Sequence, residues 1–513
     1  MSLNKPARAG AVLLAACAGV AFAAVPASAV LPDGPALARN VTKKVTVDGI
    51  NRHLVALQRL ADRNGGNRAV GTPGYEQSVD YVAAKLTAAG YDVTTPTFTY
   101  PVQVTDAATA KVGAKTVAAL PMELSPQTPV GGITAALVAV PQDATPGCEA
   151  SDFAGLPVAG SIALIRRGGC TFGTKQANAA AAGAVAVLVA NNVDGPLSGI
   201  TLGDPGLVPT GGVSKADGDA LFATPGATAT VDLRFHVDER PARNVVAETK
   251  TGRKNNVVMA GAHLDSVEEG PGINDNGSGS AALLETALQL GGSPKVNNAV
   301  RFAWWGAEEL GLVGSTKYVQ SLTFEQQLDI ALYLNFDMIA SPNAGYFVYD
   351  GDDSDATGAG EGPYGSAQIE AAFAGFLGSQ GVQTEGTDFS GRSDYGEFIA
   401  NGIPAGGLFT GAEGVKTPAQ AAKWGGQAGV AYDKCYHAKC DNLGNLDRTA
   451  LDRNADAIAW VTASYAISTE EINGVPPKTA KAKQAKAAQR TAAIEKAERR
   501  AFTAPKVVHG VIA

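Results

Sequence analysis

The sequence predicts an α/β fold whose core is a doubly wound, mostly parallel sheet flanked by helices. Three observations carry this prediction. Apolar runs typical of buried strands alternate with helical patterns from residue 242 to about 470. Polar residues that could bind a ligand follow these runs, where an open α/β sheet places its binding groups. A second, turn-punctuated αβ pattern over residues 116–238 predicts a small inserted α/β domain.

The chain begins with a segment typical of a secretory signal. Lys5 and Arg8 precede an apolar run that ends in Ala27-Ser28-Ala29, so we expect cleavage after Ala29, removal of residues 1–29, and export of the protein. The run is too short and alanine-rich for a stable membrane span, and no later stretch is apolar enough to cross a bilayer. The segment LLAAC offers an alternative, in which Cys17 anchors a lipoprotein.

The 513 residues are 45% hydrophobic, enough for two or three domains. Residues 40–115 are expected to form the first part of the main domain. Amphipathic patterns predict helices over 47–64 and 76–91, the second ended by Gly90, and a strand over 92–100. His53 falls inside the first helix pattern, where we expect a structural role.

Near residue 115 the composition changes, and the sequence that follows is rich in Ala, Gly, Val and Pro. Apolar runs at 133–140, 161–168 and 184–192 are followed by VPTGGVSKADGDAL, and this order resembles the protease-associated domain, a small insert found in several peptidases. We expect residues 116–238 to form it and to supply no catalytic group, with a structural role for His236. We hypothesise that the insert limits the size of substrate admitted.

The main domain resumes at residue 239 and runs to 472. The apolar run NNVVMAGAH ends in His263, and Asp265 follows it. A glycine-rich segment then lets the backbone turn so that Asp275 can face the same point. After a predicted helix over 278–290, the run AVRFAWW leads to Glu308 and Glu309. A further predicted strand, ALYLNFDMI, carries Asp337, and a long final helix spans 446–467.

Each of these residues has an ordinary structural explanation when it is taken alone. A histidine near a strand end is usually satisfied within the core, paired glutamates often begin a solvated helix, and Asp275 between two asparagines makes a good turn. Their coincidence after buried strands favours a shared site. Together with His437 they supply two histidines, three carboxylates and a spare glutamate, a set that suits two zinc ions bridged by one carboxylate.

Four cysteines remain if Cys17 is set aside, and they allow three disulfide pairings. The most local pairing joins Cys148 to Cys170 and Cys435 to Cys440. The second bridge would close a short loop around Tyr436 and His437. A zinc knuckle is the alternative for the last two cysteines, but no other pair has knuckle spacing, and disulfides agree with export.

The tail over residues 473–513 is basic, whereas the chain as a whole has a net charge of −8. The tail carries nine Lys and Arg against two Glu, so the body of the protein is strongly acidic. We therefore expect no nucleic-acid partner. The tail could fold back onto the body, bind an anionic cell wall or be trimmed after secretion, and these alternatives stay open.

Six motifs, in a fixed order, resemble the secreted bacterial double-zinc aminopeptidases. They are AHLDS, GINDNGSG, AWWGAEELGLVGS, NFDM, FSGRSDYGEF and CYHAKCD, and the match covers about 45–100 and 240–470. The resemblance implies that one zinc is bound by His263 and Asp337 and the other by Glu309 and His437, while Asp275 bridges them.

The same resemblance implies roles for residues that do not bind metal. Glu308 is the general base, Tyr436 donates a hydrogen bond to the tetrahedral intermediate, and Asp265 orients His263. The backbone around Arg392 and the ring of Phe409 receive the substrate's N-terminal residue. The family also offers a calcium site near Asp452 and Asp456, but its N-terminal part is not matched here, and a solvated acidic helix face is the ordinary explanation.

The function implied is that of a secreted zinc aminopeptidase, a monomer that removes N-terminal residues, above all large apolar ones such as leucine, from peptides with a free N-terminus. The attacking water would be held by the metal ions. A carboxypeptidase or dipeptidase with the same centre is the alternative, although no arginine cluster suits a free α-carboxylate. A non-catalytic surface protein is a third interpretation, disfavoured because Glu308 and Tyr436 accompany all five ligands.

Overall fold

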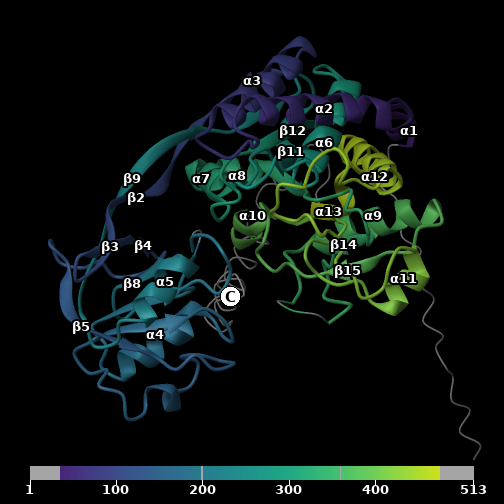
Figure 1. Ribbon diagram of the computed structural model, residues 1–513. Coiled ribbons are helices and arrows are strands. Elements are labelled where there is room, and N and C mark those ends of the chain that lie inside the picture. The colour runs from purple at the N-terminus through teal and green to yellow at the C-terminus, as the bar shows by residue number, and fades with distance from the viewer. Residues whose placement is uncertain (1–34, 198–199, 357, 359, 474–513) are drawn as a thin grey trace, which may run out of the picture.

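The computed structural model describes residues 35–473 except 198–199, 357 and 359. The predicted secretory signal, Cys17 and the basic tail beyond Asn473 lie outside the described residues. None of the helices in this described part combines the length and the hydrophobicity of a membrane-spanning segment. Figure 1 shows two units, each built on its own eight-stranded sheet and joined by two long strands.

The sheet of the larger unit is parallel at its centre, with antiparallel pairs towards both edges and one further parallel pair at the last strand. Its order is β1 (Asp92–Thr94), β10 (Val245–Glu248), β12 (Asn298–Trp305), β11 (Arg253–His263), β13 (Ile330–Phe336), β16 (Ala405–Phe409), β14 (Phe347–Tyr349) and β15 (Glu385–Thr387). The strands from β12 to β16 pair in parallel, whereas β1, β10 and β14 form the antiparallel pairs. This confirms the predicted mostly parallel sheet.

Helices cover both faces of this sheet, which explains why its central strands are apolar throughout. Alternate residues of β11 face opposite cores, so Val258 packs on one side and Met259 on the other. The Val258 side is covered by α1 (Pro35–Lys44), α2 (Val47–Arg63), α3 (Pro73–Ala88), α6 (Gly277–Leu290), α9 (Ser366–Ser379) and α12 (Arg448–Ile467). The Met259 side packs against α7 (Val313–Ser321) and α10 (Gly396–Ala400). The other helices of this unit are short: α8 (Phe324–Asp329), α11 (Pro418–Trp424) and α13 (Glu470–Asn473).

The smaller unit holds the second sheet. Its order is β3 (Lys115–Ala118), β2 (Thr97–Val112), β9 (Thr228–Arg243), β5 (Ile133–Ala139), β6 (Ile162–Arg166), β7 (Ala186–Ala190), β8 (Thr210–Val213) and β4 (Leu120–Pro121). The strands from β5 to β8 are parallel and are accompanied by α4 (Phe172–Ala181), α5 (Lys215–Phe222) and the 3₁₀ helix η1 (Ala150–Phe153).

One prediction is wrong at the junction of the two sheets. The single strand expected over 92–100 is two strands, β1 in the first sheet and β2 in the second. Pro96 lies between them and has no N–H to continue a ladder, while its carbonyl accepts the backbone N–H of Asn244 at 3.0 Å.

The two long strands β2 and β9 form an antiparallel ribbon that connects the units, as Figure 1 shows. The two strands pair along their whole length, from Thr97 opposite Arg243 to Val112 opposite Ala229, with one register shift. At its base, Phe98 and Tyr100 pack against Ala307. The ribbon therefore supports the segment that leads into Glu308.

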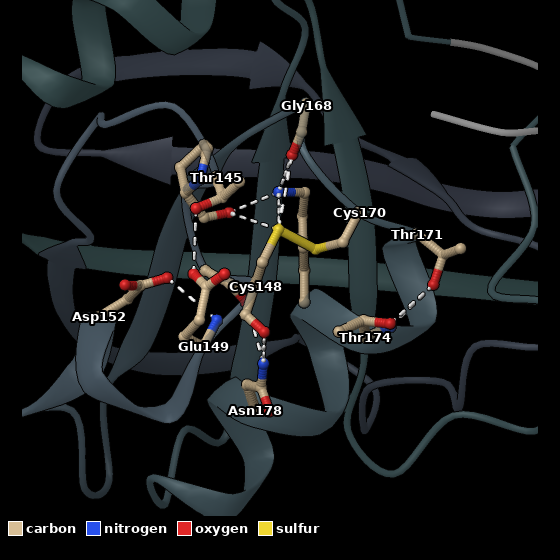
Figure 2. The surroundings of a disulfide bond; sticks show 12 residues. Thr145, Cys148, Glu149, Asp152, Gly168, Cys170, Thr171, Thr174 and Asn178 are labelled. Carbon is tan, nitrogen blue, oxygen red and sulfur yellow. Dashed lines mark hydrogen bonds between the residues drawn. A yellow bond between two sulfur atoms is a disulfide. The ribbon is translucent and has the colours of Figure 1, made fainter.

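A disulfide joins Cys148 to Cys170 in the smaller unit (Figure 2). Beside it, the buried Lys175 donates hydrogen bonds to the carbonyls of Pro146 and Gly168, and Asn178 donates to the carbonyl of Cys148 at 2.7 Å. Both side chains belong to α4, so this helix and the disulfide together hold two loops in place.

Candidate metal centre

Strand ends of the larger sheet bring the predicted metal ligands together. His263 ends β11, Asp337 directly follows β13, and Glu309 follows β12 after a short turn. Because these three strands are parallel neighbours, their carboxyl ends meet at one edge of the sheet. Asp275 reaches the same point from the loop before α6, and His437 reaches it from the loop between α11 and α12.

Asp275 lies between two groups of side chains. The Nε2 of His263 is 3.2 Å from Asp275 Oδ1 and 3.2 Å from Asp337 Oδ1. The Nε2 of His437 is 3.3 Å from Asp275 Oδ2 and 3.0 Å from Glu309 Oε2. Each oxygen of Asp275 thus completes a different trio of ligands, one with His263 and Asp337 and the other with His437 and Glu309, as a bridging carboxylate requires.

These separations fit two zinc ions. Zinc binds nitrogen and oxygen at about 2.0–2.2 Å in a tetrahedron, which places neighbouring ligand atoms about 3.3 Å apart. The four distances of 3.0–3.3 Å agree with that spacing. In addition, Glu309 Oε1 is buried and has no hydrogen-bond partner among the described residues, so a cation would satisfy it.

The crowding of buried carboxylates in the cluster also favours binding of a cation. Burial, followed by the charge of Asp275, raises the pKa of Glu309 to about 7. Burial likewise raises the pKa of Glu308 well above its ordinary value. Burial alone would lower the pKa of His437, but its contacts with Asp275 and Glu309 outweigh burial and raise it to about 10. A bound cation reverses the shifts that arise from crowded carboxylates.

Asp265 connects the histidine to the glutamate pair. Its buried carboxylate lies 3.6 Å from His263 Nδ1 and accepts the backbone N–H groups of Glu308 and Glu309 at 3.3 and 3.4 Å. The sequence predicted only the first of these contacts. The side chain of Asp265 therefore positions the turn after β12, while its backbone carbonyl, 3.2 Å from His263 Nδ1, holds the ring of His263.

Two further residues hold the ligands and were missed from the sequence. Ser393 donates to Asp337 Oδ2 at 2.6 Å, and Asp441 accepts the backbone N–H of Asp275 at 3.0 Å. Both lie inside the quoted motifs FSGRSDYGEF and CYHAKCD, which is the signal that could have found them. Neither sits in a periodic element whose pattern would have shown where its side chain points.

A disulfide between Cys435 and Cys440 closes the loop that carries Tyr436 and His437. The two rings stack with centroids 3.8 Å apart, and Arg392 Nη2 donates to the Tyr436 hydroxyl at 3.1 Å. Burial, and then the charge of Asp275, raise the pKa of Tyr436. Its hydroxyl therefore stays protonated and can donate a hydrogen bond.

The candidate centre opens into a cavity of about 240 Å³. Arg392 and Phe409, the two predicted substrate-binding residues, both line it. The carboxylates and His437 form one part of the lining. An apolar and aromatic wall forms another, made of Met338, Tyr349, Tyr395, Phe409 and Ala412.

The other candidates lie away from this cavity. His53 contacts the Tyr81 hydroxyl at 2.7 Å and Glu285 at 3.1 Å, and His236 contacts Asp106 at 2.8 Å on the ribbon. Asp452 and Asp456 lie on α12, where no third metal-binding side chain from the described part of the chain joins them. Burial, and then Asp452, raise the pKa of Asp456 to about 6.

Comparisons with known proteins agree with these observations. A family profile described as Peptidase family M28 matches residues 244–462, and a PA domain profile matches residues 133–221. The chain is 50% identical over 452 residues to the "Probable lipoprotein aminopeptidase" of Mycobacterium tuberculosis, covering 86% of this chain and 90% of the relative. It is 48% identical over 450 residues to an aminopeptidase of Pseudomonas aeruginosa, covering 82% and 81%.

Solved structures share the fold. The aminopeptidase of Aneurinibacillus sp. strain AM-1 aligns with a TM-score of 0.56 at 29% identity, over 83% of this chain and 95% of that one. The zinc aminopeptidase of Bacillus subtilis aligns with a TM-score of 0.63 at 24% identity, over 83% and 96%, a likeness of fold. With half of its aligned residues shared with a relative that it covers almost entirely, this chain is a peptidase of family M28 that carries a PA domain.

Proposed function

We propose that this chain is a secreted, zinc-dependent aminopeptidase that removes N-terminal residues, preferentially large apolar ones such as leucine. The observation that carries the proposal is the pair of ligand trios that share Asp275, placed beside Glu308 at a cavity with an apolar wall. The name of a relative with 47% identity, a leucine aminopeptidase of Arthroderma otae, supports the substrate preference.

In this proposal His263 and Asp337 hold one zinc, Glu309 and His437 hold the second, and Asp275 bridges them. Bound zinc supplies Lewis-acid chemistry, which makes a water acidic near neutral pH and polarises a carbonyl. The chain's own contribution is to hold the five ligands close together, fixed by Asp265, Ser393 and Asp441.

Two other side chains then carry out proton transfer and charge stabilisation. Glu308 belongs to neither trio. Its Oε2 lies 3.9 Å from His263 Nε2, beside the proposed zinc pair, where its carboxylate can take a proton from the attacking water. The same group returns the proton to the departing amine. The Tyr436 hydroxyl donates to the carbonyl oxygen as that oxygen gains negative charge.

The charges around the cavity favour a free N-terminus over a free C-terminus. Five carboxylates line it, and one of them, Glu308, is not among the proposed ligands and lies beside them. Arg392 is the only lysine or arginine in the described lining, and its Nη1 is already paired with Glu413 at 2.8 Å. A substrate ammonium therefore finds acceptors, whereas an α-carboxylate would meet an arginine whose charge is already balanced.

Export is the second part of the proposal. The two disulfides suit an oxidising compartment. The Mycobacterium relative is named a lipoprotein, which supports the alternative that Cys17 carries a lipid. The mass of the mature N-terminus separates the two, since cleavage after Ala29 and acylation of Cys17 give different masses.

The test compares leucine p-nitroanilide with its N-acetylated form. We expect release of p-nitroaniline from the free amine alone, loss of that activity with a chelator, and its return on addition of zinc. Cleavage of neither compound by zinc-loaded protein would contradict the proposal and direct attention to C-terminal or dipeptide substrates. Activity that survives removal of all bound metal would contradict the role of zinc.

A further inference from the structure

Arg68 places a positive charge inside the protein next to the candidate metal centre. Its side chain is 0% exposed, yet within the described residues no carboxylate lies at salt-bridge distance from it. A buried charge without a direct ion pair is costly. Arg68 belongs to the segment between α2 and α3, far in sequence from every proposed ligand.

All the hydrogen bonds of the guanidinium go to one loop. Arg68 donates to the backbone carbonyls of Leu264, Pro271 and Gly272, the last two at 3.0 and 2.6 Å. Its backbone N–H donates to Ser266 Oγ at 2.9 Å, and the backbone N–H of Ser266 donates back to the Arg68 carbonyl at 3.3 Å. Arg68 thus binds both ends of the loop that joins His263 to Asp275.

The loop packs tightly onto this side chain. Gly272 has a φ of +59°, and a Cβ there would lie 3.2 Å from Arg68 Nη2 and only 2.4 Å from Ser266 Cβ. Beyond the loop, Asp441 accepts the backbone N–H groups of Asn274 and Asp275 at 2.8 and 3.0 Å. The chain around Asp275 is therefore held from two sides, by a cation and by a carboxylate.

The charge of Arg68 also acts on the ligands at a distance. Burial lowers the pKa of Arg68 to about 10, and the surrounding carboxylates Asp265, Asp441, Asp275 and Glu309 oppose that fall. The guanidinium therefore stays charged at neutral pH. Its field offsets part of the repulsion between the carboxylates before metal binds.

We propose that Arg68 is a positioning residue of the metal centre, which holds loop 264–272 so that His263 and Asp275 face each other in the metal-free protein. The inference rests on the proposed zinc site. A purely structural role would satisfy the same carbonyls but would leave metal affinity unchanged. A positioning role makes metal affinity depend on the fork geometry of the side chain, which lysine cannot reproduce.

The test compares three full-length proteins: wild type, Arg68→Lys and Arg68→Met. Arg243→Lys is the matched control, because Arg243 forms ordinary ion pairs with Glu76 and Asp80 on α3, at 2.5 and 3.0 Å. Each protein is stripped of metal, checked for folding by circular dichroism, and titrated with Zn²⁺ against a competing chelator. The visible spectrum of the Co²⁺-loaded form is also recorded.

We expect Arg68→Lys to weaken Zn²⁺ binding by about 10- to 100-fold, the range usual for residues that orient metal ligands, and to alter the Co²⁺ spectrum. Arg68→Met should weaken binding at least as much, and Arg243→Lys should leave both unchanged. A folded Arg68→Lys protein with wild-type affinity and spectrum would overturn the inference, even if it melted at a lower temperature. Tighter binding by Arg68→Met would overturn it as well. Wild-type protein that binds no Zn²⁺ would instead defeat the proposed function itself.

Discussion

Glu308 and Glu309 are adjacent in sequence, but the structure separates their roles. Both line the cavity, but Glu309 lies 3.0 Å from His437 Nε2 within one ligand trio, whereas Glu308 belongs to neither trio. We expect Glu308→Gln to lower kcat by about 10²–10⁴-fold, the contribution typical of a general base, and to retain both zinc ions. Glu309→Gln, in contrast, should bind less zinc per chain than wild type, because it removes a proposed ligand. The measurements are turnover of leucine p-nitroanilide and zinc content per chain, and near-normal turnover by Glu308→Gln would contradict the assignment.

The proposed metal ligands and the proposed general base could be picked out from the sequence, because they follow predicted strands or lie within recognisable motifs. The residues that hold them could not. Arg68 was missed because its partners are backbone carbonyls about 200 positions away, and a carbonyl has no side chain to mark it in the sequence. Ser393 and Asp441 act through single contacts from loops, where no periodicity reports the direction of a side chain.

At the scale of elements, burial decided what the sequence could predict. The strands β11, β12 and β13 are covered on both faces, so they read as continuous apolar runs and were found. The helix α1 was missed within a stretch that looks merely polar, because little more than Ala38 and Val41 enter the core. The break at Pro96 was missed because both strands beside it have the same pattern.

The loop after β14 and the helix α9 share a cluster of carboxylates whose effect depends on pH. Glu370 on α9 accepts the backbone N–H of Gly351 at 2.7 Å, and burial, and then Asp350 and Asp352, raise its pKa to about 7. The folded protein therefore binds this proton more tightly than the unfolded chain. The resulting stabilisation is complete below about pH 4.3, the ordinary value for Glu, and is lost as the pH rises through about 7.

Replacing Glu370 with Gln should remove this dependence. We expect the melting temperature of Glu370→Gln, relative to wild type, to rise steadily between pH 5 and pH 8 in matched buffers. Asp352→Asn removes one neighbouring charge and should reduce the pH dependence of the wild type without abolishing it. A difference between Glu370→Gln and wild type that stays constant over this range would show that Glu370 does not titrate there.

The whole molecule consists of a peptidase unit and a second sheet carried on the β2–β9 ribbon. The hypothesis that this insert limits substrate size can be tested by deleting the insert, because the ribbon provides two paired residues between which the chain can be reconnected. Gln103 and Val237 are opposite each other in the antiparallel pair, so an Asn-Gly turn can replace residues 104–236 and close a hairpin. The hairpin keeps Phe98 and Tyr100, whose packing against Ala307 supports the approach to Glu308.

We expect the shortened protein to hydrolyse leucine p-nitroanilide at the wild-type rate, because every proposed ligand and Glu308 belong to the peptidase unit. If the insert restricts access, kcat/KM for a long unstructured peptide should rise relative to that for a leucine dipeptide. Wild type assayed on the same pair of substrates is the reference, and circular dichroism confirms folding. An unchanged ratio in a folded, active protein would show that the insert does not select substrates by length.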